Sequence, residues 1–174
     1  MTNTMDTSTA TSAEAPKPAP TLQDLQKISH DYHVPVSEET LNGVLASHAA
    51  SGGDAAKSFT DYVKTTAQGL YPTFAPQIAA GIPTAYLLDP YRQVGKQVLG
   101  EQFEPNFQGD PKMRVALEGS RDPQTGRPVP MTLIEWMMHL KSEPSFGWAQ
   151  TPQGQEAMNT VRTKIHEAFT NGAM

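Results

Sequence analysis

Apolar side chains recur three or four positions apart from residue 21 onward, which is the spacing of one face of a helix. The first such stretch begins after the N-cap residue Thr21 and fades near His33, because Pro35 disfavours helical geometry in the residue before it. Ser37 is predicted to cap a second helix, and Asp54 a third. The third stretch has the most regular apolar stripe and is predicted to be a central helix: Phe59, Tyr62, Val63, Thr66 and Leu70.

Proline and glycine divide the following part of the chain into short segments. Pro72, Pro76 and Pro83 limit residues 74–80 to about one helical turn, which Gly81 is placed to close in a left-handed conformation. An N-cap residue followed by proline predicts later helix starts at Asp89-Pro90, Asp110-Pro111 and Thr151-Pro152.

A turn or small hairpin is predicted over residues 120–131, where Gly126 supplies turn chemistry. Thr132 and Glu135 then form a capping box for a helix with a large apolar face. The last helix is expected to stop at Asn171-Gly172, with apolar positions at Val161, Ile165 and Phe169. Together these patterns predict a mainly α fold, a compact single domain of several short helices over residues 21–174 with one small turn or hairpin.

Residues 1–20 are rich in Thr, Ser, Ala and Pro and have few bulky apolar side chains. Burial cannot offset the entropy of ordering such a segment, so a disordered leader is expected. It lacks the basic start and apolar run of a signal peptide, and no stretch approaches the roughly 20 apolar residues of a membrane span. No membrane is therefore expected among the partners.

Composition narrows the chemistry further. The sequence contains no cysteine, which excludes disulfides, thiolate zinc sites and thiol nucleophiles. The net charge is −5, and neither half of the chain has the surplus of Lys and Arg that drives nucleic-acid binding, so a nucleic-acid partner is disfavoured. Because phosphate-loop, GxSxG and HExxH motifs are also missing, no cofactor and no metal are expected.

Two side-chain pairs have spacings that occur in functional sites. His30 and His33 are three apart, but two ligands do not make a metal site and Asp31 points elsewhere, so an ordinary solvated pair is favoured. Glu135 and His139 are four apart, as a general base and its orienting partner would be. The capping box already accounts for Glu135, and no nucleophile or oxyanion device accompanies the pair.

Positive charge is concentrated in the middle of the chain. Acidic residues are interleaved with it, which favours a solvated, salt-linked face over an anion or nucleic-acid site. The cations concerned are Arg92, Lys96, Lys112, Arg114, Arg121 and Arg127.

A resemblance to virion structural proteins of tailed bacteriophages, particularly those of actinobacteria, extends over most of residues 22–169. It rests on the Tyr-Pro-x-Phe step at 71–74, the Asp-Pro-Tyr step at 89–91 and the Leu-x-x-Trp helix at 133–136, which a proline and aromatic pair follows. The resemblance implies a structural part of a phage particle, in the head interior, at the head-tail junction or on the tail. It implies no catalytic residues.

We therefore expect a non-enzymatic virion component that is assembled in the host cytoplasm and binds itself or larger virion proteins. A host-directed binding module that inhibits or redirects a cellular protein is the alternative, and a small enzyme using Glu135 and His139 is a second alternative. Short helices broken by proline cannot all turn their aromatic faces inward, so some aromatics are expected at an assembly surface. The expected anchors are Tyr71, Phe74, Tyr86, Tyr91, Phe103 and Phe107.

Overall fold

The structure is a computed structural model that describes residues 19–51 and 55–171. The predictions for the leader up to residue 18 and for the cap at Asp54 lie outside the described residues. The predicted mainly helical fold with a small hairpin is confirmed. In order, the elements are α1 (Leu22–Asp31), α2 (Glu38–Ser51), α3 (Ala55–Leu70), η1 (Pro72–Phe74), α4 (Ala75–Ala79), α5 (Thr84–Leu99), α6 (Pro111–Glu118), β1 (Ser120–Arg121), β2 (Pro128–Val129), α7 (Leu133–Ser142), η2 (Pro144–Phe146), η3 (Trp148–Gln150) and α8 (Pro152–Asn171).

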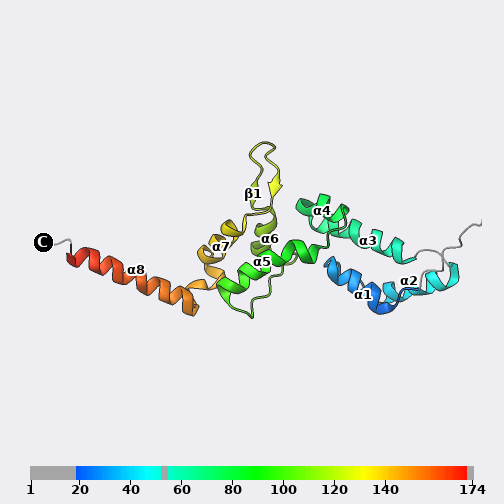
Figure 1. Cartoon of the computed structure of the whole chain (residues 1–174), viewed down its shortest axis with the longest axis horizontal. Coiled ribbons are helices and arrows are strands. Elements are labelled where there is room, and N and C mark those ends of the chain that lie inside the picture. The colour runs from blue at the N-terminus through cyan, green and yellow to red at the C-terminus, as the bar shows by residue number, and fades with distance from the viewer. Residues whose placement is uncertain (1–18, 52–54, 172–174) are drawn as a thin grey trace, which may run out of the picture.

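Helices α1 to α4 pack on one another at one end of the molecule (Figure 1). The predicted cap of α1 is confirmed, because the Thr21 hydroxyl accepts a hydrogen bond from the Asp24 backbone N–H at 3.2 Å. In return, the Asp24 carboxylate accepts one from the Thr21 backbone N–H. Gly81 closes the segment after α4 with φ of 91°, as predicted. The buried side chains of this end include Leu25, Val63 and Ile78, which are fully shielded from solvent.

Helix α5 runs from the α1–α4 end to α7 and joins the two (Figure 1). It begins at Thr84, so the predicted start at Asp89-Pro90 is wrong. Pro90 lies inside the helix on its exposed side, while Thr84, Leu88 and Tyr91 on the other side are buried. Burial of that side on two neighbouring elements outweighs the backbone hydrogen bond that proline cannot make.

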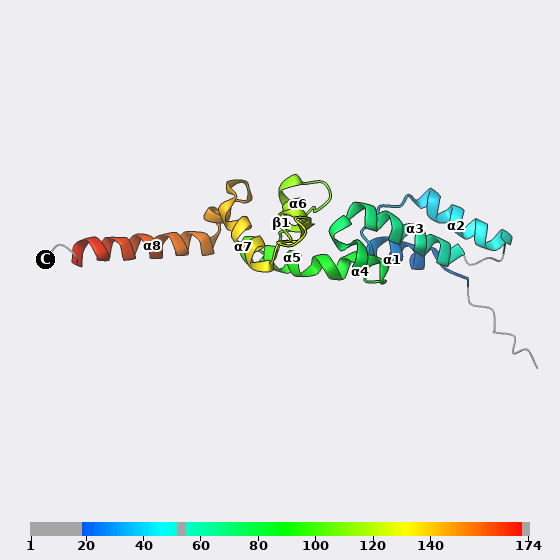
Figure 2. The ribbon, with the colours of Figure 1, turned by 90° about the horizontal axis from the view of Figure 1, so that it is seen from above.

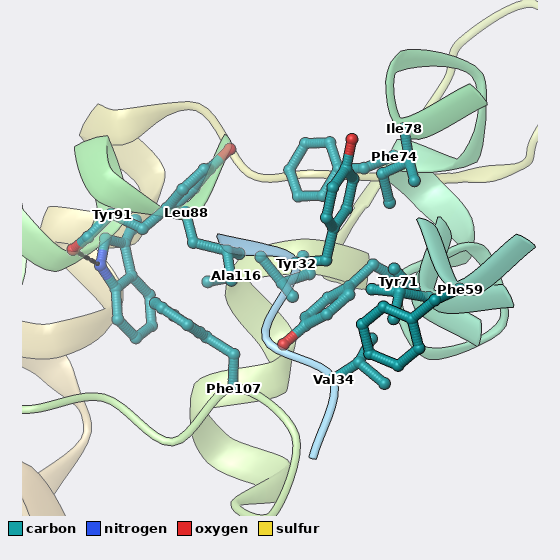
Figure 3. Close-up of a cluster of buried hydrophobic side chains, with 14 of the residues drawn as sticks. Tyr32, Val34, Phe59, Tyr71, Phe74, Ile78, Leu88, Tyr91, Phe107 and Ala116 are labelled. Carbon is teal, nitrogen blue, oxygen red and sulfur yellow. Dashed lines mark hydrogen bonds between the residues drawn. The ribbon is translucent and has the colours of Figure 1, made fainter. Parts of the chain in front are cut away.

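Helix α7 packs on α5, and the predicted hairpin joins α6 to α7, its strands pairing antiparallel with Ser120 opposite Val129. The Tyr91 hydroxyl donates to the Met131 carbonyl at 2.7 Å, and the Trp136 indole N–H donates to the Tyr91 carbonyl at 2.9 Å. Trp136 is fully buried, and its ring packs near Phe107 and Phe146. One cluster of buried side chains continues from Leu25 in α1 to Leu140 in α7. Figure 3 shows part of it, between Phe59 and Tyr91.

Helix α8 projects from the rest of the molecule in both views (Figures 1 and 2). It starts at the predicted Thr151-Pro152 boundary, where the Thr151 hydroxyl accepts from the Gly154 N–H at 3.1 Å. It contacts the body at η3, where Gly154 is buried against the backbone of Trp148. Every side chain from residue 155 to residue 170 is exposed.

Candidate functional site

The structure separates the six aromatics expected at an assembly surface. Tyr86 is 75% exposed, and Phe103 is partly buried against Phe146. The expectation of surface anchors is wrong for four residues, which belong to the core shown in Figure 3: Tyr71, Phe74, Tyr91 and Phe107.

Their burial has a physical cause in the way the short helices are arranged. Helix α5 passes between the two groups of helices, so aromatics on either side of the proline breaks have an apolar surface to pack on. The two tyrosines among them also find hydrogen-bond partners inside, since Gln108 donates to the Tyr71 hydroxyl at 2.7 Å and Tyr91 donates to Met131. In this fold they stabilise the chain itself.

A groove of about 970 Å³ opens between α1, the start of α2, α5 and the segment 104–108. We call it the acidic groove. Its apolar lining includes Val34, Leu41 and Leu88, and Tyr86 lies in its wall. Its charged lining consists of four carboxylates and one guanidinium, from Asp31, Glu38, Asp89, Glu104 and Arg92.

His33 lies in the wall of this groove, in a left-handed conformation with φ of 51°. Its Nδ1 lies 3.2 Å from the Thr84 hydroxyl, which donates to the Asp31 carbonyl at 3.3 Å, and its own carbonyl accepts from Gln108 at 2.7 Å. Burial lowers the pKa of His33, and the charges of His30 and Arg92 lower it further. The imidazole is therefore neutral near pH 7 and helps to join α1 to α5.

The two histidines of HDYH differ in environment. His30 is exposed and stacks on His33 with ring centroids 6.0 Å apart, while His33 is half-buried, so the expectation that both are solvated is correct only for His30. The neighbouring Asp31 carboxylate accepts from Lys27 at 2.6 Å. Among residues 19–51 and 55–171, His, Asp and Glu side chains form no group of three that could hold a metal ion.

Glu135 and His139 contact different residues in the structure. Glu135 accepts from the Thr132 N–H at 2.7 Å and from the Ser120 hydroxyl at 3.0 Å, and these bonds lower the pKa of its carboxyl group. His139 stacks on Trp136 with centroids 5.7 Å apart, and its Nε2 lies 3.2 Å from the Lys112 carbonyl oxygen. Both side chains thus have structural contacts that fix α7.

Four of the clustered cations form ion pairs, as expected of a salt-linked face. Lys96 lies 2.8 Å from the Glu104 carboxylate and lowers the pKa of that group, and Arg92 lies 4.0 Å from it. The other two pairs join Lys112 to Glu143 and Arg114 to Glu118, both at 3.1 Å.

The second surface feature is an apolar stripe on α8, which we call the α8 face. It consists of Met158, Val161, Ile165 and Phe169, whose exposed fractions range from 52% to 78%. These residues are spaced by three, four and four positions, so they line one side of the helix over about three turns. Sequence periodicity points to a stripe here, but it cannot tell whether the chain covers it.

No protein-family model matches the chain, and neither the search of curated proteins nor that of solved structures found a match. Within the part of the chain that the structure describes, no helix is both long and apolar enough to cross a membrane.

Proposed function

We propose that this chain is a non-enzymatic structural component of a bacteriophage particle that acts through protein-protein contacts made by α8. The observation that carries the proposal is the α8 face, four large apolar side chains on a helix that projects from the body (Figure 1). The resemblance to virion proteins of tailed phages supplies the kind of assembly. The partners are further copies of the chain or larger virion proteins.

The physical argument concerns the stability of α8. Helix α8 contains Gly, Asn and several β-branched residues, which are poor helix formers, so the propensity of its residues contributes little to its stability. Most helical stability in proteins comes from packing of the apolar face, which here lies in solvent. A partner that covers the α8 face would therefore stabilise the helix and gain the energy of burying it.

Particle composition tests the proposal. The gene product would be supplied in trans to a phage lacking it, either complete or shortened after Thr151 so that α8 is removed. We expect the complete chain in purified particles and a strong loss of incorporation for the shortened chain. Circular dichroism of the shortened chain checks that its body remains helical, as the core formed by residues 25–140 predicts.

The outcomes separate the parts of the proposal. Absence of the complete chain from particles would reject the virion role. Equal incorporation of the complete and shortened chains would show that α8 is not the contact. A host-directed binding module could use the same α8 face. That function would be favoured if the complete chain captured one host protein stably and the chain itself were absent from particles.

A further inference from the structure

Helix α7 has an exposed apolar surface in addition to its buried residues. Leu133, Ile134 and Met138 are 42%, 66% and 63% exposed, although Trp136 and Leu140 of the same helix are fully buried. We call these three exposed residues the α7 face. The consecutive α-helices α7 and α8 therefore both present apolar side chains to solvent.

The α7 face and the α8 face meet at Trp148 in η3. Lys141 is three residues after Met138 and in line with the α7 face, and its Nζ lies 5.4 Å from the centroid of the Trp148 ring. Gly154 is four residues before Met158 and in line with the α8 face, and it is buried against the backbone of Trp148. The two faces thus form one continuous strip that passes over η3.

This strip can pair with the same strip of a second copy. Helices α7 and α8 follow each other along the molecule with η3 between them (Figures 1 and 2), so a two-fold axis at η3 places α8 of each copy antiparallel beside α7 of the other. The lengths agree, because the 10 residues of α7 span about 15 Å and the α8 face, from Met158 to Phe169, spans about 17 Å. Resting on the proposed assembly role, we infer that two copies form a reciprocal dimer in which the α8 face of each covers the α7 face of the other.

Buried area favours the reciprocal contact over simpler ones. A large apolar side chain that is about half exposed presents roughly 100 Å², so one α8 face on one α7 face buries roughly 700 Å² in total, the size of a crystal-packing contact. Pairing of α8 with the α8 of a second copy buries roughly 800 Å² and leaves both α7 faces in solvent. The reciprocal dimer buries roughly 1,400 Å², which is within the range of stable specific interfaces.

Charges at the borders of the two faces agree with antiparallel pairing. Arg162 lies at one border of the α8 face, and Glu135 lies at one border of the α7 face. The hydrogen bonds that the Glu135 side chain accepts from Thr132 and Ser120 all end on Oε2, and within the described residues no donor meets its Oε1. Antiparallel pairing brings corresponding borders of two helices together, so this oxygen can accept from Arg162 of the second copy.

Thiol cross-linking tests the arrangement, because the natural chain contains no cysteine. The variants Ile134→Cys and Val161→Cys are prepared as separate full chains, mixed and treated with a short bismaleimide. We expect a covalent dimer in the mixture and at most a trace when either variant is treated alone, since the axis separates identical positions. Glu156→Cys, on the opposite side of α8, replaces Val161→Cys in the control mixture and should give no covalent dimer.

Sedimentation velocity over a concentration series measures the strength of the contact. The natural chain should pass from monomer to dimer, and I134E/M138E on α7 and V161E/I165E on α8 should each weaken the dimer about hundredfold. R162E should weaken it about tenfold, while its control E156K should leave it unchanged. All these positions are exposed, so circular dichroism should show the same melting temperature of the monomer for every variant.

Four results would overturn the inference. The natural chain would remain a monomer at every concentration; or I134E/M138E would dimerise like the natural chain; or Val161→Cys alone would cross-link as well as the mixture, which would mean that α8 pairs with α8. The fourth is a cross-link within one chain of the double variant I134C/V161C at high dilution, which would mean that α8 folds back on its own α7.

The failure of this dimer and the failure of the proposed function give different results. Each overturning result leaves the proposed function standing if the chain still enters particles through α8. Conversely, a reciprocal dimer of a chain never found in particles would reject the virion role and keep the dimer.

Discussion

Helices α7 and α8 both have an apolar stripe, but α7 buries Trp136 and Leu140 completely while the α8 face remains in solvent. The difference lies in what surrounds each helix. Helix α7 lies against α5 and donates an indole hydrogen bond to it, whereas α8 meets the body at η3. An amphipathic pattern therefore specifies which side of a helix must be covered, and the rest of the fold decides whether the same chain covers it.

The largest effect that tests this comparison is expected at the centre of the covered helix. Trp136→Ala should lower the free energy of unfolding by about 3 to 5 kcal/mol, because it opens a cavity and removes the donor to the Tyr91 carbonyl. Urea unfolding followed by circular dichroism measures the loss. The control is Phe169→Ala on α8, and equal stabilities of the two variants would contradict the assignment of Trp136 to the core.

The junction between the body and α8 should show an intermediate effect. A Cβ atom at Gly154 would lie 2.1 Å from the Trp148 carbonyl oxygen, so Gly154→Ala must displace the first turn of α8. We expect a loss of about 1 to 3 kcal/mol of stability at this junction, seen as faster amide exchange in η3 and early α8.

The matched control for this substitution is Gly43→Ala in α2, where an added Cβ meets nothing within 4 Å. It should raise stability by about 0.5 to 1 kcal/mol, because alanine is the better helix former. A Gly154→Ala variant as stable as the Gly43→Ala variant would show that α8 is not seated on η3.

A smaller effect is expected from pH, since His33 is only half-buried. Its pKa is lower in the folded chain than in the unfolded one, so its contribution to stability is present above the ordinary value of about 6.5 and is lost as pH falls below it. The melting temperature of the natural chain should therefore fall more steeply from about pH 7 to 5 than that of His33→Asn. Asparagine suits the left-handed backbone there.

His166→Asn is the control, because His166 lies on exposed α8. That variant should keep the pH dependence of the natural chain. Parallel pH curves for the natural chain and His33→Asn would mean that the imidazole near Thr84 does not couple protonation to folding.

The smallest effect on folding is expected within the α8 face. Ile165→Ala should change the stability of the dilute monomer by no more than about 0.5 kcal/mol, because Ile165 is 52% exposed. The matched substitution on α7, Leu140→Ala, should cost about 2 to 5 kcal/mol. A large loss for Ile165→Ala in the dilute monomer would mean that the chain covers its own α8.

Local signals in the sequence predicted helix ends well where one turn of backbone decides the outcome. Thr132 and Glu135 form the expected capping box, and the Asp110 side chain accepts from the Lys112 N–H ahead of α6. The same kind of signal failed at Asp89-Pro90, where packing of α5 on both sides of the core outweighed it. Capping energies of about 1 kcal/mol are smaller than the burial of several large side chains.

The sequence by itself determined the helical class, the hairpin and the existence of an apolar stripe over Val161, Ile165 and Phe169, because these depend on residues a few positions apart. Only the tertiary structure decided that Tyr71, Phe74, Tyr91 and Phe107 are core residues and that the stripe on α8 is not. Burial depends on which distant surfaces meet, and here α5 brings such surfaces together for the aromatics, while η3 directs α8 away from them. The acidic groove likewise forms only where α1, α5 and residues 104–108 come together, so no local sequence pattern predicts it.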